Sequence, residues 1–197
     1  SLLNILAGFE KQSEGTVLFD DEPYATNWRG KVIPHDEVFY SNHPELTGSA
    51  KTVSSYVASK FGKKKNVIQN RYFNTGSFKN LWDRNLNQIS QGERHWLGMV
   101  LACETDPRVL LIDDYGMYFN SNTEQDFRNQ LTKMNRTLGT TLVLSAPTDD
   151  HLKKFASVLI FLDNGHIARI RPGISRKPQN KNQRDNRKRR GRGRRNR

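Results

Sequence analysis

The 197-residue chain carries a net charge of +12, which lies almost entirely at its C-terminal end. Residues 174–197 contain 12 Lys and Arg against one acidic residue, Asp185, so residues 1–173 are nearly neutral. No window approaches the ~20 apolar residues of a membrane-spanning helix, no secretory signal is visible, and a single cysteine cannot form an internal disulfide. These features exclude membrane-spanning and disulfide-stabilised secreted proteins and favour a cytoplasmic one. Because the sequence begins at Ser1 rather than methionine, we expect it to continue upstream.

The first half of the chain predicts short elements separated by polar segments. Apolar spacing and turn residues indicate these elements, in chain order: a helix at Leu2–Leu6, strands at Thr16–Phe19 and Lys31–Pro34, a helix at Thr52–Phe61 and a second helix near Phe78–Trp82.

The second half shows a regular alternation of helices and strands. A helix opens at Ser90, and the elements after it are expected at Val109–Ile112 (strand), Thr123–Leu138 (helix), Thr141–Leu144 (strand), His151–Phe155 (helix), Val158–Leu162 (strand) and His166–Ile170 (strand). The continuous apolar run Val109–Ile112 is typical of a parallel strand that helices cover on both faces. The chain is therefore predicted to be an α/β domain with a mostly parallel sheet.

Two carboxylates, Asp113 and Asp114, directly follow the most apolar of these strands. Ligands of open parallel sheets bind beyond the carboxyl ends of the strands. A carboxylate there suits a magnesium ion that keeps several waters and bridges to phosphate oxygens, and a second carboxylate can polarise an attacking water. The alternative is that the pair simply caps the next turn.

A second motif, Ser90–Glu93 (SQGE), opens the helix that precedes this strand. Its serine and glutamate have the spacing of a capping box. Gly92 has no side chain to shield the backbone N–H groups of the helix start, which attract phosphate through their free donors and the helix dipole. The alternative is a well-capped helix with no ligand.

The order of these pieces resembles a known family. LNQISQGERHWLGMVLACETDPRVLLIDD resembles the region from the signature helix to Walker B in ATP-binding cassette (ABC) ATPases. SLLNILAGFEKQSEGTVLFDDEP is similar to the segment after their Walker A loop, and TLVLSAPTDDHLKKFASVLIFLDNGHI to their switch strand and the strands beyond it. The resemblance implies a P-loop NTPase-like three-layer fold that binds ATP and Mg²⁺.

The resemblance also implies a division of the chain. Residues 1–36 and 89–173 would form the nucleotide-binding core, with Walker A upstream of the first segment. Residues 37–88 would form a small helical subdomain that contacts a membrane partner, and residues 174–197 a disordered basic tail.

Carried over residue by residue, the family pattern assigns Asp113 to the magnesium ion and Asp114 to the general base, where the family usually has glutamate. Ser1 aligns just beyond the phosphate-binding loop and is counted with the ATP-binding residues, as is His35, at the position of the Q-loop glutamine. Asn120 stands at the D-loop aspartate.

The signature positions would close on the ATP of a second cassette; they are Ser90, Gln91, Gly92 and Glu93. Pro147 (or Ala146) stands where the family has its switch histidine, and neither can hydrogen-bond a γ-phosphate. Aspartate is also one methylene shorter than glutamate, and small misplacement of a base can cost ~100-fold in rate. We therefore expect a cassette that binds ATP but hydrolyses it slowly.

Three readings of function stay open. The first is the ATP-binding subunit of an ABC transporter, peripheral on the inner face of the cell membrane and bound to a membrane-spanning subunit. The second is a soluble ABC-type ATPase that acts on RNA or ribosomes through its basic tail. A regulatory, non-hydrolytic cassette is a third possibility. The arginine-rich residues 176–197 could neutralise phosphates of RNA or of anionic lipid, or serve only as a solubilising tail.

Overall fold

The computed structural model describes residues 2–41, 51–74 and 76–173. The chain divides into two compact units, Ser1–Thr148 and Asp149–Arg197, and each is described by itself. Ser1 and the basic tail at 174–197 lie outside the described residues. Within the described ranges, no helix has the length and apolar character needed to cross a membrane.

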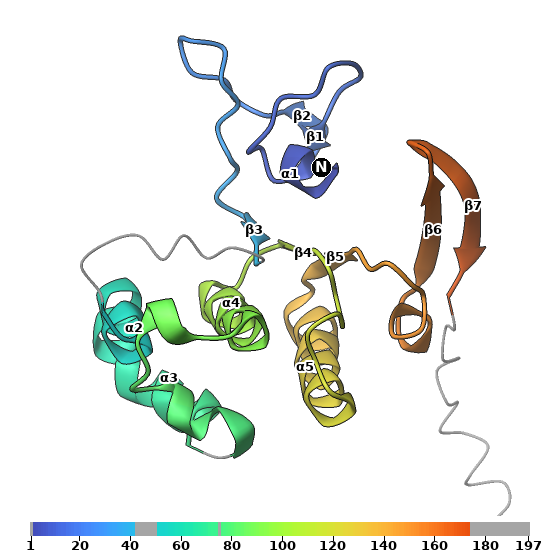
Figure 1. Ribbon diagram of the computed structural model, residues 1–197. Helices are drawn as coiled ribbons and strands as arrows, with labels where there is room; N and C mark the ends of the chain where they lie inside the picture. Colours follow the sequence, from blue (N-terminus) through green and yellow to red (C-terminus); the bar gives the residue numbers. More distant parts are fainter. Residues whose placement is uncertain (1, 42–50, 75, 174–197) are drawn as a thin grey trace, which may run out of the picture. The chain divides into compact units, whose positions relative to one another are not determined.

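The first unit begins with a short helix, α1 (Leu2–Leu6), as predicted. Gly8, two residues after the end of the helix, turns the chain with a φ of +76°, a conformation that glycine adopts without steric cost. Strand β1 (Leu18–Phe19) then pairs antiparallel with β2 (Glu22–Pro23) in a two-stranded sheet. Figure 1 shows these elements in blue.

The prediction of a strand at Lys31–Pro34 is wrong. Only an isolated bridge between Thr26 and Val32 forms there. The Asn27 side chain accepts hydrogen bonds from the backbone N–H groups of Arg29 and Lys31 and so holds a loop. The strand instead comes later, as β3 (Val38–Tyr40), within the range assigned to the helical subdomain.

A parallel sheet of three strands forms the centre of the first unit, in the order β3–β4–β5 (Figure 1). β4 (Val109–Ile112) lies in the middle, with Val38 and Thr141 as the partners of Val109. Its last three residues are at most 1% exposed. The predicted buried parallel strand is confirmed, as is its neighbour β5 (Thr141–Leu144).

Helices of the first unit follow the predicted pattern with small changes. They are α2 (Val53–Phe61), a 3₁₀ turn at Gly62–Lys64, α3 (Lys65–Tyr72), 3₁₀ segments at Gly76–Leu81 and Leu86–Gln88, α4 (Gln91–Thr105), and α5 (Ser121–Lys133) continued by a π turn at Met134–Leu138. α3 was not predicted, because its mostly polar sequence shows no clear apolar face.

The described part of the second unit, residues 149–173, contains a 3₁₀ turn at Leu152–Lys154 and a hairpin of β6 (Val158–Asp163) and β7 (His166–Pro172), shown in orange and red in Figure 1. β6 pairs antiparallel with β7, whereas we expected it in the parallel sheet. One face carries apolar side chains that are 57–61% exposed: Val158, Ile160, Leu162, Ile167 and Ile170. On the other face, the guanidinium groups of Arg169 and Arg171 lie 4.2 and 5.6 Å from the ring of Phe161.

Candidate functional site

The predicted carboxylates lie at the carboxyl edge of the parallel sheet. Asp113 follows β4 directly, and both it and Asp114 are half-buried. Asp114 adopts a left-handed conformation with φ of +51°, which aspartate tolerates better than most residues. The turn this produces carries the chain away from the strand at the place where a parallel sheet binds ligands.

Hydroxyl groups from both neighbouring strands contact the Asp113 carboxylate. The Tyr40 hydroxyl, at the end of β3, donates to Oδ2 at 3.3 Å, and the Ser145 hydroxyl, just after β5, donates to Oδ1. The backbone N–H of Asp114 also donates to Oδ1, at 3.2 Å. Burial, with the charge of Asp113, raises the pKa of Tyr40 to about 12, so this hydroxyl keeps its proton at neutral pH.

The donor set at this edge fits a magnesium ion. It consists of oxygen atoms from carboxylates and hydroxyls, which are the ligands a hard cation prefers. No cluster of three or more His, Cys, Asp or Glu side chains that could hold a metal occurs within the described ranges. One or two carboxylates at a phosphate site, rather than a cage of protein ligands, is how magnesium–nucleotide sites are usually built.

The SQGE segment forms the capping box that its spacing predicts. Ser90 is the N-cap of α4: its hydroxyl accepts from the Glu93 N–H at 3.3 Å, and its own N–H donates to Glu93 Oε2 at 2.8 Å. Arg84 pairs with the other carboxylate oxygen at 2.6 Å. Burial raises the pKa of Glu93, but the hydrogen bonds from Ser90 and Arg84 outweigh it and lower the pKa overall.

These contacts within the chain occupy the Ser90 hydroxyl and the Glu93 carboxylate. A phosphate would therefore meet the backbone of the exposed Gln91 and of Gly92 rather than the Ser90 hydroxyl or the Glu93 carboxylate. Gly92 also has a packing role, since a Cβ there would lie 3.0 Å from the carbonyl oxygen of Tyr118. Tyr118 belongs to the loop that follows Asp113 and Asp114, so the helix start and the carboxylate loop touch.

His35 does not join the carboxylates in this structure. It lies three residues before β3, at the amino edge of the sheet, whereas Asp113 follows β4 at the carboxyl edge. Its ring stacks on Phe19 with centroids 4.1 Å apart, and its Nδ1 accepts from the Glu37 N–H at 3.2 Å. The residue that follows β3 directly is the buried Ser41.

The remaining predicted positions have local roles. The Asn120 side chain caps α5 by accepting from the Thr123 N–H at 2.9 Å. Pro147 is exposed in the bend after β5. Sequence reasoning missed Tyr40 and Ser145; Ser145 could have been found, because it directly follows a predicted parallel strand.

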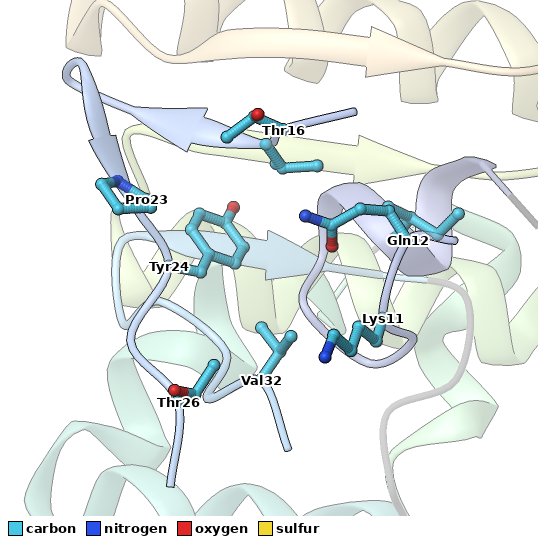
Figure 2. Close-up of a pocket in the computed structure, with 9 residues that line it drawn as sticks. Lys11, Gln12, Thr16, Pro23, Tyr24, Thr26 and Val32 are labelled. Carbon is cyan, nitrogen blue, oxygen red and sulfur yellow. The ribbon is translucent and has the colours of Figure 1, made fainter. Parts of the chain in front are cut away.

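A small pocket lies elsewhere in the first unit. Figure 2 shows Lys11, Gln12, Thr16, Tyr24 and Val32 among the residues that line it. Its volume of about 80 Å³ is well below the roughly 300 Å³ at which drug-sized ligand sites begin. The pocket is too small for an adenine nucleotide, and the Asp113 edge remains the candidate site.

Comparisons with known proteins identify the family of this chain. The ABC transporter family matches residues 1–115. The sulfate/thiosulfate import ATP-binding protein CysA 2 of Agrobacterium fabrum is 27% identical over 85% of this chain and 50% of its own length. The spermidine/putrescine import ATP-binding protein PotA of Mesoplasma florum is 23% identical over 85% of this chain and 49% of its own. The chain thus spans about half the length of these curated relatives.

Solved structures show the same fold. The ATP-binding cassette MJ0796, a dimer in a post-hydrolysis state bound to ADP and Pi, matches with a TM-score of 0.67 and 18% identity, over 87% of this chain and 78% of that one. The protein cbiO1 of Clostridium perfringens, part of the ABC transporter complex cbiONQ, matches with a TM-score of 0.63 and 16% identity, over 86% and 70%. The predicted P-loop NTPase-like α/β fold is confirmed. The chain belongs to the ABC transporter family, as an ATPase domain of that family.

Proposed function

We propose that this chain is the ATP-binding subunit of an ABC transporter, in which it binds magnesium–ATP together with a second cassette and hydrolyses the nucleotide slowly. The carrying observation is the Asp113 carboxylate, held at the carboxyl end of the buried strand β4 by hydroxyls from both neighbouring strands. The relatives CysA 2 and PotA, which are import ATP-binding proteins, support the transport role.

In this proposal each site residue has one task. Asp113 holds the magnesium ion, which when bound neutralises charge on the phosphates. Asp114 accepts a proton from the attacking water. The N–H groups at the start of α4, at Gln91 and Gly92, face the nucleotide of the second cassette.

Slow hydrolysis follows from two side chains. The short Asp114 places its carboxylate about one methylene farther from the water than a glutamate would, and proton transfer depends steeply on that distance. The Pro147 side chain has no hydrogen-bonding group with which to contact a γ-phosphate. Both changes leave ATP binding intact and weaken only the chemical step.

The ATP site is tested by Asp113→Asn in the full-length protein. We expect the wild-type protein to bind ATP more tightly in Mg²⁺ than in EDTA. The variant should bind ATP about 10- to 100-fold more weakly than wild type in Mg²⁺, and as tightly as wild type in EDTA. Fluorescence titration with a labelled ATP analogue measures both. The exposed Asp126→Asn in α5 is the matched control. If Asp113→Asn keeps the full gain from Mg²⁺, Asp113 does not hold the ion.

The partners proposed are a membrane-spanning transporter subunit and a second cassette. The helices of residues 37–88, chiefly α2 and α3, would dock on the membrane subunit, which places the chain at the cytoplasmic face of the membrane. Purification of the full-length protein from its own cells under mild detergent should recover a membrane protein in stoichiometric amount. Recovery of ribosomal RNA instead would support the alternative, a soluble ABC-type ATPase that binds RNA through residues 176–197.

A further inference from the structure

The Asp113 carboxylate is held by donors from three different segments. Tyr40 donates to one oxygen from the end of β3, and Ser145 donates to the other from the end of β5. The N–H of Asp114 reaches Oδ1 at 3.2 Å and the Ser145 hydroxyl at 3.3 Å. Each oxygen of the carboxylate therefore has a hydroxyl donor, and the two donors lie on opposite sides of β4.

The backbone of the sheet fixes where these hydroxyls lie. The N–H of Ser41, the residue after Tyr40, donates to the Leu111 carbonyl at 3.0 Å, so the ladder between β3 and β4 continues past Tyr40. The N–H of Ser145 donates to the Ile112 carbonyl at 2.9 Å, and its own carbonyl accepts from the Tyr115 N–H at 2.8 Å. Because both donor residues are bonded to β4 through the main chain, their side chains start from fixed positions on either side of the carboxylate.

We infer that Tyr40 and Ser145 are positioning residues that fix the orientation of the Asp113 carboxylate for the metal ion. This inference rests on the proposed function, because it takes Asp113 as the metal-holding residue. A carboxylate can rotate about its Cβ–Cγ bond, and rotation that must stop when the ion binds lowers affinity. Hydroxyl donors on both oxygens remove that freedom beforehand. Partners of this kind typically change metal affinity 10- to 100-fold.

The two residues act through Asp113 rather than on the nucleotide. Their removal should therefore weaken metal binding and leave metal-free nucleotide binding unchanged. A purely structural role would not produce this difference, since a distorted sheet edge would impair both. Ser145→Thr keeps the hydroxyl on a slightly larger side chain and so should restore the affinity that Ser145→Ala loses.

The experiment uses Mn²⁺ as the probe, titrated into the full-length protein with a non-hydrolysable ATP analogue and followed by electron paramagnetic resonance. We expect Tyr40→Phe and Ser145→Ala to weaken Mn²⁺ binding about 10- to 100-fold each and Ser145→Thr to bind like wild type. Affinity for the analogue in EDTA should be the same in all. Tyr24→Phe and Ser59→Ala, which lose hydrogen bonds to the Leu6 and Tyr56 carbonyls, are matched controls away from the site.

The outcomes separate this inference from the proposed function. If Asp113→Asn weakens Mn²⁺ binding but Tyr40→Phe and Ser145→Ala bind like wild type, the positioning role is overturned and the metal site stands. A Ser145→Thr variant as weak as Ser145→Ala would also overturn it. If Asp113→Asn itself binds Mn²⁺ like wild type, the proposed function fails and this inference fails with it.

Discussion

Replacing Asp114 by glutamate should raise the rate of ATP hydrolysis by the full-length protein about 100-fold. The longer side chain brings the carboxylate closer to the attacking water, and the rate of proton transfer depends on that distance. Asp114 has a φ of +51°, a conformation that glutamate tolerates less well than aspartate. We therefore expect the faster variant to be less stable, by about 1 kcal/mol in its free energy of unfolding. Phosphate release and chemical denaturation measure the two effects.

Asp114→Asn is the matched control for the first effect. Asparagine has nearly the size of aspartate and adopts a positive φ as readily, but it cannot accept a proton from water. The remaining slow hydrolysis should fall to background while Mg²⁺-dependent ATP binding is kept. Turnover in Asp114→Asn equal to wild type would show that Asp114 is not the base. Equal rates in wild type and Asp114→Glu would show that the aspartate is already long enough.

Gly98→Ala should destabilise the first unit by about 2 kcal/mol, although alanine is the better helix former. Gly98 lies in the middle of α4, where its backbone meets the end of β3. A Cβ there would collide with the carbonyl oxygen of Ser41 and lie 3.3 Å from its carbonyl carbon. Ser41 cannot easily move away, since its N–H is bonded to the Leu111 carbonyl of β4. The steric cost exceeds the gain of about 1 kcal/mol in helix propensity.

Urea denaturation of the two proteins measures this difference. The exposed Gln125→Ala in α5 serves as the control, because it introduces alanine into a helix with no new contact and should change stability by less than about 0.5 kcal/mol. A Gly98→Ala protein as stable as wild type would mean that α4 can shift away from β3 without loss. In that case the contact does not hold the helix against the sheet.

The sequence predicts the central strand and the helix before it because both signals are local. Val109–Ile112 is an uninterrupted apolar run, and Ser90 and Glu93 stand three residues apart at a helix start; the structure shows a buried strand and a capping box at these places. In both cases the physical cause of the structure lies within a few neighbouring residues.

One error involves a partner that is distant in sequence. β3 has three residues in a polar stretch and is a strand only because β4, about 70 residues later, pairs with it. Without β3, nothing in the sequence shows that Tyr40 ends a parallel strand and that His35 precedes one. The two residues therefore lie at opposite edges of the sheet, although only five positions separate them. The hydrogen bonds of Tyr40 and Ser145 to Asp113 depend on the same long-range pairing.

The hairpin of β6 and β7 limits how the chain can be divided for biochemical work. An isolated two-stranded hairpin is marginally stable in water, and this one has an exposed apolar face of five aliphatic side chains. Expressed from Asp149 onward, such a fragment would expose strand edges and apolar surface together, a combination that promotes aggregation. Truncations intended to isolate the arginine-rich end should therefore begin after Gly173, and those that remove it should end there.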